Sequence, residues 1–209
     1  MVDQDDDGDD DRDGGDAGRI LAVVHSHPDA PAQPSDADRA SCEATGLPWV
    51  IVSVREGQVE EVHQFAPTGW QAPLLGRQFF HGVLDCYTLV RDWYRREAGI
   101  ELMPYVSEDD WWNKGQDLYM DNFAKAGFER LPDGAPLKPG DMILMAVRSP
   151  VANHAGIYLG SRPLAEAPGL YPVPSAMLQH LYGRLSERVV YGGYWQECTR
   201  AVIRHKDLA

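Results

Sequence analysis

Cys86 stands at the predicted start of a helix, a place where a thiol can act as a nucleophile. Asp85 precedes it, and apolar side chains follow it at Leu89, Val90, Trp93 and Tyr94. This spacing predicts an amphipathic helix whose apolar face packs on a core and carries the cysteine inward. The first-turn N–H groups and the helix dipole lower the pKa of a thiol there, and the thiolate is the form that attacks carbonyl carbons. We predict that Cys86 is a nucleophile, with a buried core residue as the alternative.

A histidine at the start of a predicted strand is the candidate base for this thiol. Residues 139–147 read Pro-Gly-Asp followed by an apolar run, and residues 153–160 form a second strand-like run that begins near His154. The turn residues and the apolar runs indicate two consecutive strands. A cysteine with a histidine far along the chain is typical of a nucleophile and a base that meet only in the fold.

A third polar group should hold the far ring nitrogen of the histidine, and two candidates are adjacent. The strand-like run of residues 176–181 contains Gln179 and His180. Neighbouring side chains of a strand point to opposite faces, so only one of the two can contact His154. The pattern alone leaves both open.

These motifs resemble those of the NlpC-type cell-wall cysteine peptidases. The resemblance rests on the Asp85–Cys86 pair that opens a helix, on the Pro-Gly-Asp turn, and on the His-Ala-Gly-Ile-Tyr-Leu-Gly run from His154. It implies a papain-like α+β fold, in which the helix with the cysteine packs on a small antiparallel sheet. It also implies cleavage of peptide bonds in peptidoglycan stems without a cofactor. The resemblance places the third catalytic residue at Gln179, before a His-Leu-Tyr-Gly run, with His180 as the alternative.

A narrower resemblance covers residues 75–205. The run of residues 180–186 and the Tyr-Gly-Gly-Tyr-Trp run of residues 191–195 are similar to those of tail-tip assembly proteins of lambda-like phages. This similarity implies a peptidoglycan hydrolase that is also a tail assembly component. It would be made in the host cytoplasm and located at the tail tip of the virion, in contact with other tail-tip proteins and with peptidoglycan. The alternative is a structural tail-tip protein with weak catalysis.

Two positions depart from the pattern of these relatives. Tyr87 follows the Asp-Cys pair where a serine is usual, and Phe79 and Phe80 stand near the place where many relatives carry a tyrosine that helps to stabilise the oxyanion. A phenylalanine donates no hydrogen bond. Backbone N–H groups, including that of Cys86, are therefore the expected oxyanion donors.

Two histidines near the N-terminus have the spacing of metal ligands. The apolar run of residues 19–24 predicts a buried strand, which ends at His25-Ser-His27, and Ser35 and Asp38 follow at the start of the next helix. Histidines two residues apart on an extended segment project to one side, and an aspartate can complete three zinc ligands with water as the fourth. The alternative is a strand edge with two solvent-facing histidines.

The same spacing resembles that of the JAMM (MPN-type) zinc isopeptidases. The resemblance implies that His25, His27 and Asp38 hold zinc and that Ser35 polarises the oxyanion. That family uses an upstream glutamate as general base for the zinc-bound water, but residues 1–24 contain no glutamate. The segment is also shorter than a whole domain of that family. We expect a truncated JAMM-like α/β segment, or the product of a late start site, that can still bind zinc; an active zinc isopeptidase is the least favoured function.

Length and composition divide the chain into four parts. Its 209 residues, 44% of them hydrophobic, suffice for one or two compact domains. We predict a disordered acidic tail at residues 1–18, the partial JAMM-like segment at 19–66, a turn-rich linker at 67–76 and the peptidase domain at 77–209.

Charge and cysteine content exclude several classes of function. The net charge is −13, and residues 1–18 alone hold nine aspartates and one arginine, which disfavours nucleic-acid binding. The sequence has no apolar run long enough for a membrane span and no signal peptide. Three scattered cysteines form neither a disulfide framework nor a zinc-spaced cluster, so we expect reduced thiols.

Overall fold

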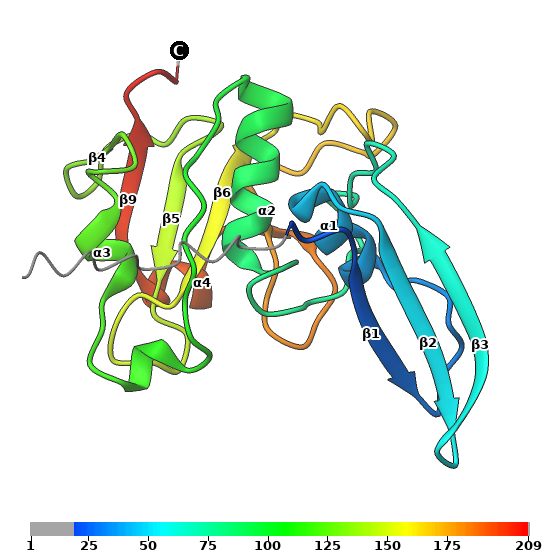
Figure 1. Ribbon diagram of the computed structural model, residues 1–209. Helices are drawn as coiled ribbons and strands as arrows, with labels where there is room; N and C mark the ends of the chain where they lie inside the picture. Colours follow the sequence, from blue (N-terminus) through cyan, green and yellow to red (C-terminus); the bar gives the residue numbers. More distant parts are fainter. Residues whose placement is uncertain (1–18, 209) are drawn as a thin grey trace, which may run out of the picture. The chain divides into compact units, whose positions relative to one another are not determined.

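The computed structural model describes residues 19–208 (Figure 1), and the predicted acidic tail at residues 1–18 lies outside them. Helices and two separate sheets confirm the predicted α+β class. The helices are α1 (Asp36–Thr45), α2 (Cys86–Trp93), α3 (Leu118–Asn122) and α4 (Tyr194–Cys198), with a π-helical segment at Tyr94–Ala98 and a 3-10 turn at Trp111–Asn113. The strands are β1 (Val23–Pro28), β2 (Trp49–Arg55), β3 (Gln58–Phe65), β4 (Phe128–Arg130), β5 (Met142–Met145), β6 (His154–Gly160), β7 (Ala176–Gln179), β8 (Glu187–Val190) and β9 (Thr199–His205). Within residues 19–208, none of the helices has the length and apolar character needed to span a membrane.

The first compact unit comprises residues 19–32 and 47–66 and holds a three-stranded sheet in the order β1-β2-β3. β1 runs parallel to β2, and β3 runs antiparallel to it. The predicted strand at residues 19–24 is wrong in its extent, because pairing with β2 begins only at Val23 and continues to Pro28. Ile20 and Leu21 precede the paired segment and are exposed. His25 and His27, the two histidines of the zinc motif, are therefore residues of β1.

The second unit comprises residues 33–46 and 67–208, and its sheet has six antiparallel strands in the order β4-β9-β5-β6-β7-β8. It includes α1, whereas the sequence predicts that residues 36–45 belong to the N-terminal segment. The carboxylate of Glu43 on α1 accepts hydrogen bonds from the backbone N–H groups of residues 68–70, and these contacts tie the helix to this unit. The division of the chain at residues 66 and 76 stays a prediction.

α2 begins at Cys86 because the residue before it caps the helix. The carboxylate of Asp85 accepts the N–H of Thr88 at 2.8 Å, and the Thr88 hydroxyl accepts the N–H of Asp85 at 2.7 Å. These reciprocal bonds form a capping box, which fixes the first turn of a helix. The prediction that the cysteine opens a helix is confirmed.

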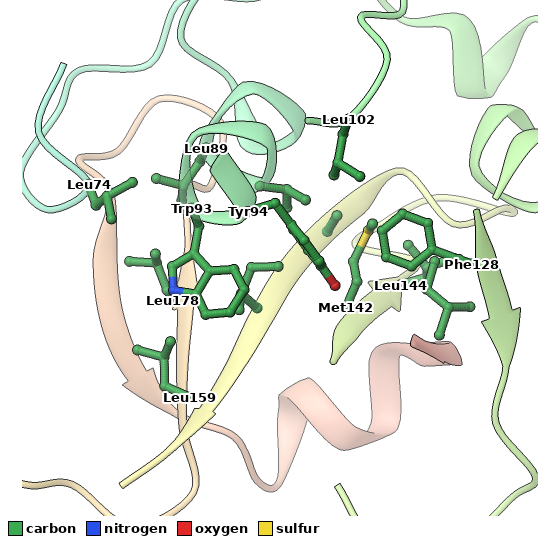
Figure 2. Packing of buried hydrophobic residues seen from close by; sticks show 14 of the residues in the cluster. Leu74, Leu89, Trp93, Tyr94, Leu102, Phe128, Met142, Leu144, Leu159 and Leu178 are labelled. Carbon is green, nitrogen blue, oxygen red and sulfur yellow. The ribbon is translucent and has the colours of Figure 1, made fainter. Parts of the chain in front are cut away.

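The apolar face of α2 forms one side of the main core. Leu89, Val90, Trp93 and Tyr94 are almost completely buried, as their spacing predicted. Figure 2 shows Trp93 and Tyr94 pointing from the helix toward the sheet, where they meet leucine and methionine side chains of the strands. Burial of large apolar side chains on this scale contributes about 2 kcal/mol for each of them. The packing therefore holds the start of α2 in a fixed position over the sheet.

The strands beneath α2 bring the histidine motif under the cysteine. β5 and β6 are antiparallel with Met145 opposite His154, so the predicted pair of strands is confirmed. β7 pairs with the other edge of β6, with Gln179 opposite Gly156. The prolines within residues 161–175 predict an irregular loop, and this segment forms neither helix nor strand. Three consecutive sheet strands thus carry the segments that the sequence singled out.

The segment after α2 differs from its expected structure. The apolar spacing after Leu118 predicts an amphipathic helix stopped by Gly127, but α3 ends at Asn122 and Phe128 begins β4. Gly127 has a φ of +87°, a left-handed backbone that ends helical structure and turns the chain into the strand. The short helix places Tyr119 in the cavity described below.

Candidate active site

Cys86 lies where α2 packs on β6. The thiol is partly buried, and its Sγ atom lies 3.4 Å from the hydroxyl oxygen of Tyr119. A backbone group of Ala155, the residue after His154, also lies within hydrogen-bonding reach of the sulfur. Cys86 and His154 line the same cavity, which has a volume of about 900 Å³. The structure therefore brings the predicted nucleophile and the predicted base together in one site.

His154 is held by a hydrogen bond from its far ring nitrogen. The ring is buried, with 4% exposure, and Nε2 lies 2.9 Å from Oε1 of Gln179. An amide oxygen only accepts hydrogen bonds, so this contact assigns the ring proton to Nε2 and leaves the lone pair on Nδ1. The Nε2 of Gln179 makes a longer contact of 3.4 Å with Glu187. Nδ1 of His154 is thus the atom that can accept a proton.

His180 has different surroundings. Its side chain is fully buried, its ring packs edge-on against Phe79 at 5.1 Å, and it does not line the cavity. Neither ring nitrogen has a hydrogen-bond partner that meets normal geometry. Burial first, and then the charge of Arg77, lowers its pKa to about 4, so the ring is neutral at pH 7. The contact with His154 is made by Gln179; its catalytic role stays a prediction.

The electrostatics of the thiol differ from our expectation. Burial, followed by the charge of Asp85, raises the pKa of Cys86 to about 11. Hydrogen bonds from Tyr119 and from backbone groups of Ala155 and Tyr87 act in the opposite direction but do not outweigh the loss of solvent. The expected lowering by the helix start is therefore wrong, because the N-capping carboxylate and burial oppose it.

His154 is also uncharged in the resting site, like the thiol of Cys86. Burial lowers the pKa of its imidazole to about 4, against the opposing effect of the hydrogen bond to Gln179. At pH 7 the thiol is protonated and the imidazole is neutral. This pair can still react, because a neutral imidazole is able to take the thiol proton while the sulfur attacks a carbonyl carbon.

A neutral resting pair predicts how Cys86 reacts with alkylating reagents. The rate of its modification by iodoacetamide should rise about tenfold per pH unit between pH 7 and pH 10, since only the thiolate reacts. Mass spectrometry of tryptic peptides measures labelling of Cys86 apart from Cys42 and Cys198. A rate that is already at its plateau at pH 6 would show a thiolate–imidazolium pair and contradict this assignment.

Aromatic side chains make up much of the cavity wall. For Trp111 and Trp112 the sequence favours a core role over a glycan groove, because large aromatic side chains are mostly buried. Trp111 is 5% exposed, and both side chains line the cavity. The ring of Trp195 lies 6.2 Å from that of His154. The other aromatic residues of the wall are Phe79, Tyr87, Tyr105, Tyr119, Phe123, Phe128, Tyr182 and Tyr194. Tyr119 carried no motif in the sequence, and only the fold places it beside the thiol.

The residues of the zinc motif lie in both units. In the first unit, the Nε2 atoms of His25 and His27 are 3.1 Å apart, and Nδ1 of His27 lies 2.8 Å from the carbonyl oxygen of Pro31. In the second unit, Ser35 caps α1, and the carboxylate of Asp38 accepts both its backbone N–H and its hydroxyl at 2.7 Å.

Comparisons with known proteins extend over most of the chain. The profile of the NlpC/P60 family matches residues 75–204, and that of prokaryotic homologs of the JAB domain matches residues 9–67. The tail tip assembly protein K of Escherichia phage N15 is 43% identical over 195 residues, which cover 92% of this chain and 72% of that protein. The tail tip assembly protein K of Escherichia phage lambda is 40% identical over 189 residues, which cover 90% of this chain and 83% of that protein.

Proposed function

Because this chain belongs to the NlpC/P60 family and, within it, groups with the tail tip assembly proteins K, we propose that it is a tail-tip protein with peptidase activity. The second unit acts as a cysteine endopeptidase or amidase on the stem peptides of peptidoglycan. The protein resides in the virion at the tail tip and contacts other tail-tip proteins. One observation carries the peptidase proposal: Cys86 and His154 face one cavity, and the far nitrogen of His154 is held by Gln179.

The reaction follows from the roles of these three side chains. Sγ of Cys86 attacks the carbonyl carbon of the scissile bond, and its proton passes to Nδ1 of His154. The carbonyl oxygen becomes an oxyanion. When the tetrahedral intermediate collapses, His154 protonates the leaving amine and an acyl thioester remains on Cys86; water then hydrolyses it. The amide of Gln179 orients the imidazole, although a neutral amide stabilises an imidazolium less than a carboxylate does.

The cavity supports a substrate larger than a single amino acid. Its volume of about 900 Å³ lies at the upper end of ordinary ligand pockets. Aromatic side chains along the wall provide flat apolar surfaces, while arginines at positions 91, 148 and 184 offer charge to carboxylates. A stem peptide combines short aliphatic side chains with carboxylates, and such a wall fits that chemistry.

The second candidate is a tail-tip component whose catalysis is weak or absent. Two observations favour it: the names of both relatives describe assembly alone, and the resting thiol and imidazole are both neutral, with pKa values shifted away from pH 7. A zinc isopeptidase remains the third candidate, without a glutamate in residues 1–24 to serve as general base.

We also propose that the N-terminal histidines can hold zinc. A separation of 3.1 Å between two ring nitrogens is close to that of two ligands on one tetrahedral ion. The contact of Nδ1 of His27 with the carbonyl oxygen of Pro31 assigns the ring proton to Nδ1, so Nε2 is the nitrogen that carries the lone pair. The resemblance to the zinc isopeptidases implies Asp38 as the third ligand. A bound zinc ion would supply a Lewis acid in this segment.

Digestion of purified peptidoglycan tests the proposed function. The wild-type protein should release peptide fragments that mass spectrometry identifies as cut stem peptides. Prior treatment with iodoacetamide at pH 9 should stop the release, whereas EDTA should leave it unchanged because the cysteine site needs no metal. No release from cell walls of several compositions would favour the structural candidate, and loss of activity with EDTA would favour the zinc candidate.

A further inference from the structure

Within residues 19–208, Tyr119 has the only side-chain hydroxyl that lies within hydrogen-bond distance of the sulfur of Cys86. Its oxygen lies 3.4 Å from Sγ, and both residues line the same cavity. The two residues come from different elements, α3 and the first turn of α2. No motif in the sequence links these positions, which lie 33 residues apart.

The ring of Tyr119 is fixed by other aromatic side chains. Its centroid lies 6.1 Å from that of Trp111 and 6.3 Å from that of Tyr87, both at steep angles. The ring also packs against the main core cluster. Tyrosine has few rotatable bonds, so this packing holds the hydroxyl at the sulfur without a large entropy cost on substrate binding.

The neighbouring hydroxyl of Tyr87 has another partner. It donates to the carbonyl oxygen of Met103 at 2.7 Å, although the ring belongs to the same turn of α2 as the thiol. Phe79, also in the cavity wall, donates no hydrogen bond. Tyr119 is therefore the aromatic residue of the cavity wall whose hydroxyl oxygen lies within hydrogen-bond distance of the reacting sulfur.

The geometry points to Tyr119 as a further catalytic residue, which donates a hydrogen bond to the negative charge that forms at Cys86 and then on the scissile carbonyl oxygen. This inference rests on the proposed peptidase function. It adds a side-chain donor to the backbone N–H groups that are expected to stabilise the oxyanion.

The position of the hydroxyl suits both charges. After attack, the carbonyl oxygen is bonded to the carbon that carries the sulfur, so a donor next to Sγ can reach it. The reaction transfers no proton from Tyr119: the thiol proton goes to His154 and then to the leaving amine. Burial and the charge of Cys86 raise the pKa of Tyr119 well above its usual value, so the hydroxyl keeps its proton and remains a donor.

Tyr119→Phe tests this role, because it removes the hydroxyl and keeps the ring. We expect kcat for stem-peptide cleavage to fall about 100-fold, the usual effect of losing one oxyanion donor, while KM changes less than about threefold. Tyr171→Phe is the matched control: Tyr171 is exposed on the loop before β7, lies outside the cavity and should retain wild-type kinetics. Unchanged kcat in a folded Tyr119→Phe protein, or a rise in KM alone, would overturn the inference.

A second measurement does not depend on peptidase activity. The hydrogen bond from Tyr119 favours the thiolate of Cys86, so its loss should raise the pKa of that thiol. At pH 9, iodoacetamide should therefore label Cys86 at least about threefold more slowly in Tyr119→Phe than in the wild type or Tyr171→Phe. If the wild type cleaves no stem peptide, the proposed function fails, and equal labelling rates would then overturn the role of Tyr119 separately.

Discussion

Replacing His154 by alanine should lower kcat/KM for stem-peptide cleavage by about 10⁴-fold. The imidazole is the group placed to take the thiol proton, and the thiol gives almost no thiolate by itself because burial raises its pKa to about 11. Loss of the base in a nucleophile–base unit typically removes about this much activity. Cleavage of a synthetic stem peptide, followed by chromatography, measures the change. Activity within tenfold of the wild type would mean that another group activates Cys86.

The same assay decides which residue orients the imidazole. Gln179→Ala should reduce kcat/KM about tenfold, since it removes one neutral hydrogen bond worth about 1.4 kcal/mol. His180→Phe should change kcat/KM little, because that ring does not line the cavity and packs on Phe79. A phenylalanine keeps the buried volume and limits loss of stability. If His180→Phe lowered kcat/KM more than Gln179→Ala did, with both proteins folded, His180 would be the residue that orients the imidazole.

Local sequence patterns were enough to predict the elements around the nucleophile. Asp85 and Thr88 fix the helix start through contacts within one turn, and the apolar spacing to Tyr94 identifies the face that packs on the sheet. The strands at His154 and Gln179 follow from continuous apolar runs, which indicate fully buried strands. These helix and strand assignments depend on residues that are close together in the sequence, so the sequence alone is enough to predict them.

Local sequence patterns do not predict properties that depend on contacts between distant parts of the chain. The position of Cys86 at a helix start predicts a lowered thiol pKa, but burial and the charge of Asp85 raise that pKa. The extent to which the thiol is removed from solvent depends on the packing of the whole fold, which local sequence does not show. Tyr119 reaches the thiol from α3, a helix that ends at Asn122, before the stop at Gly127 that the apolar pattern predicts. The grouping of α1 with the second unit depends on contacts of Glu43 with residues 68–70. Contacts between distant segments leave little trace in local spacing.

The central claim is that Cys86 forms a covalent acyl-enzyme during cleavage of a stem peptide. Its replacement by alanine removes the nucleophile, so cleavage should fall to the uncatalysed rate while the protein stays folded, because a small residue at the first position of a helix costs little stability. Cys198→Ala is the control, since Cys198 does not line the cavity.

Mass spectrometry of the intact protein after acid quench, during turnover of a stem peptide, measures this intermediate most directly. The wild type and Cys198→Ala should gain the mass of the acyl fragment, mapped to Cys86 by digestion, and Cys86→Ala should show neither the adduct nor cleavage. Cleavage by Cys86→Ala at the wild-type rate would contradict the account.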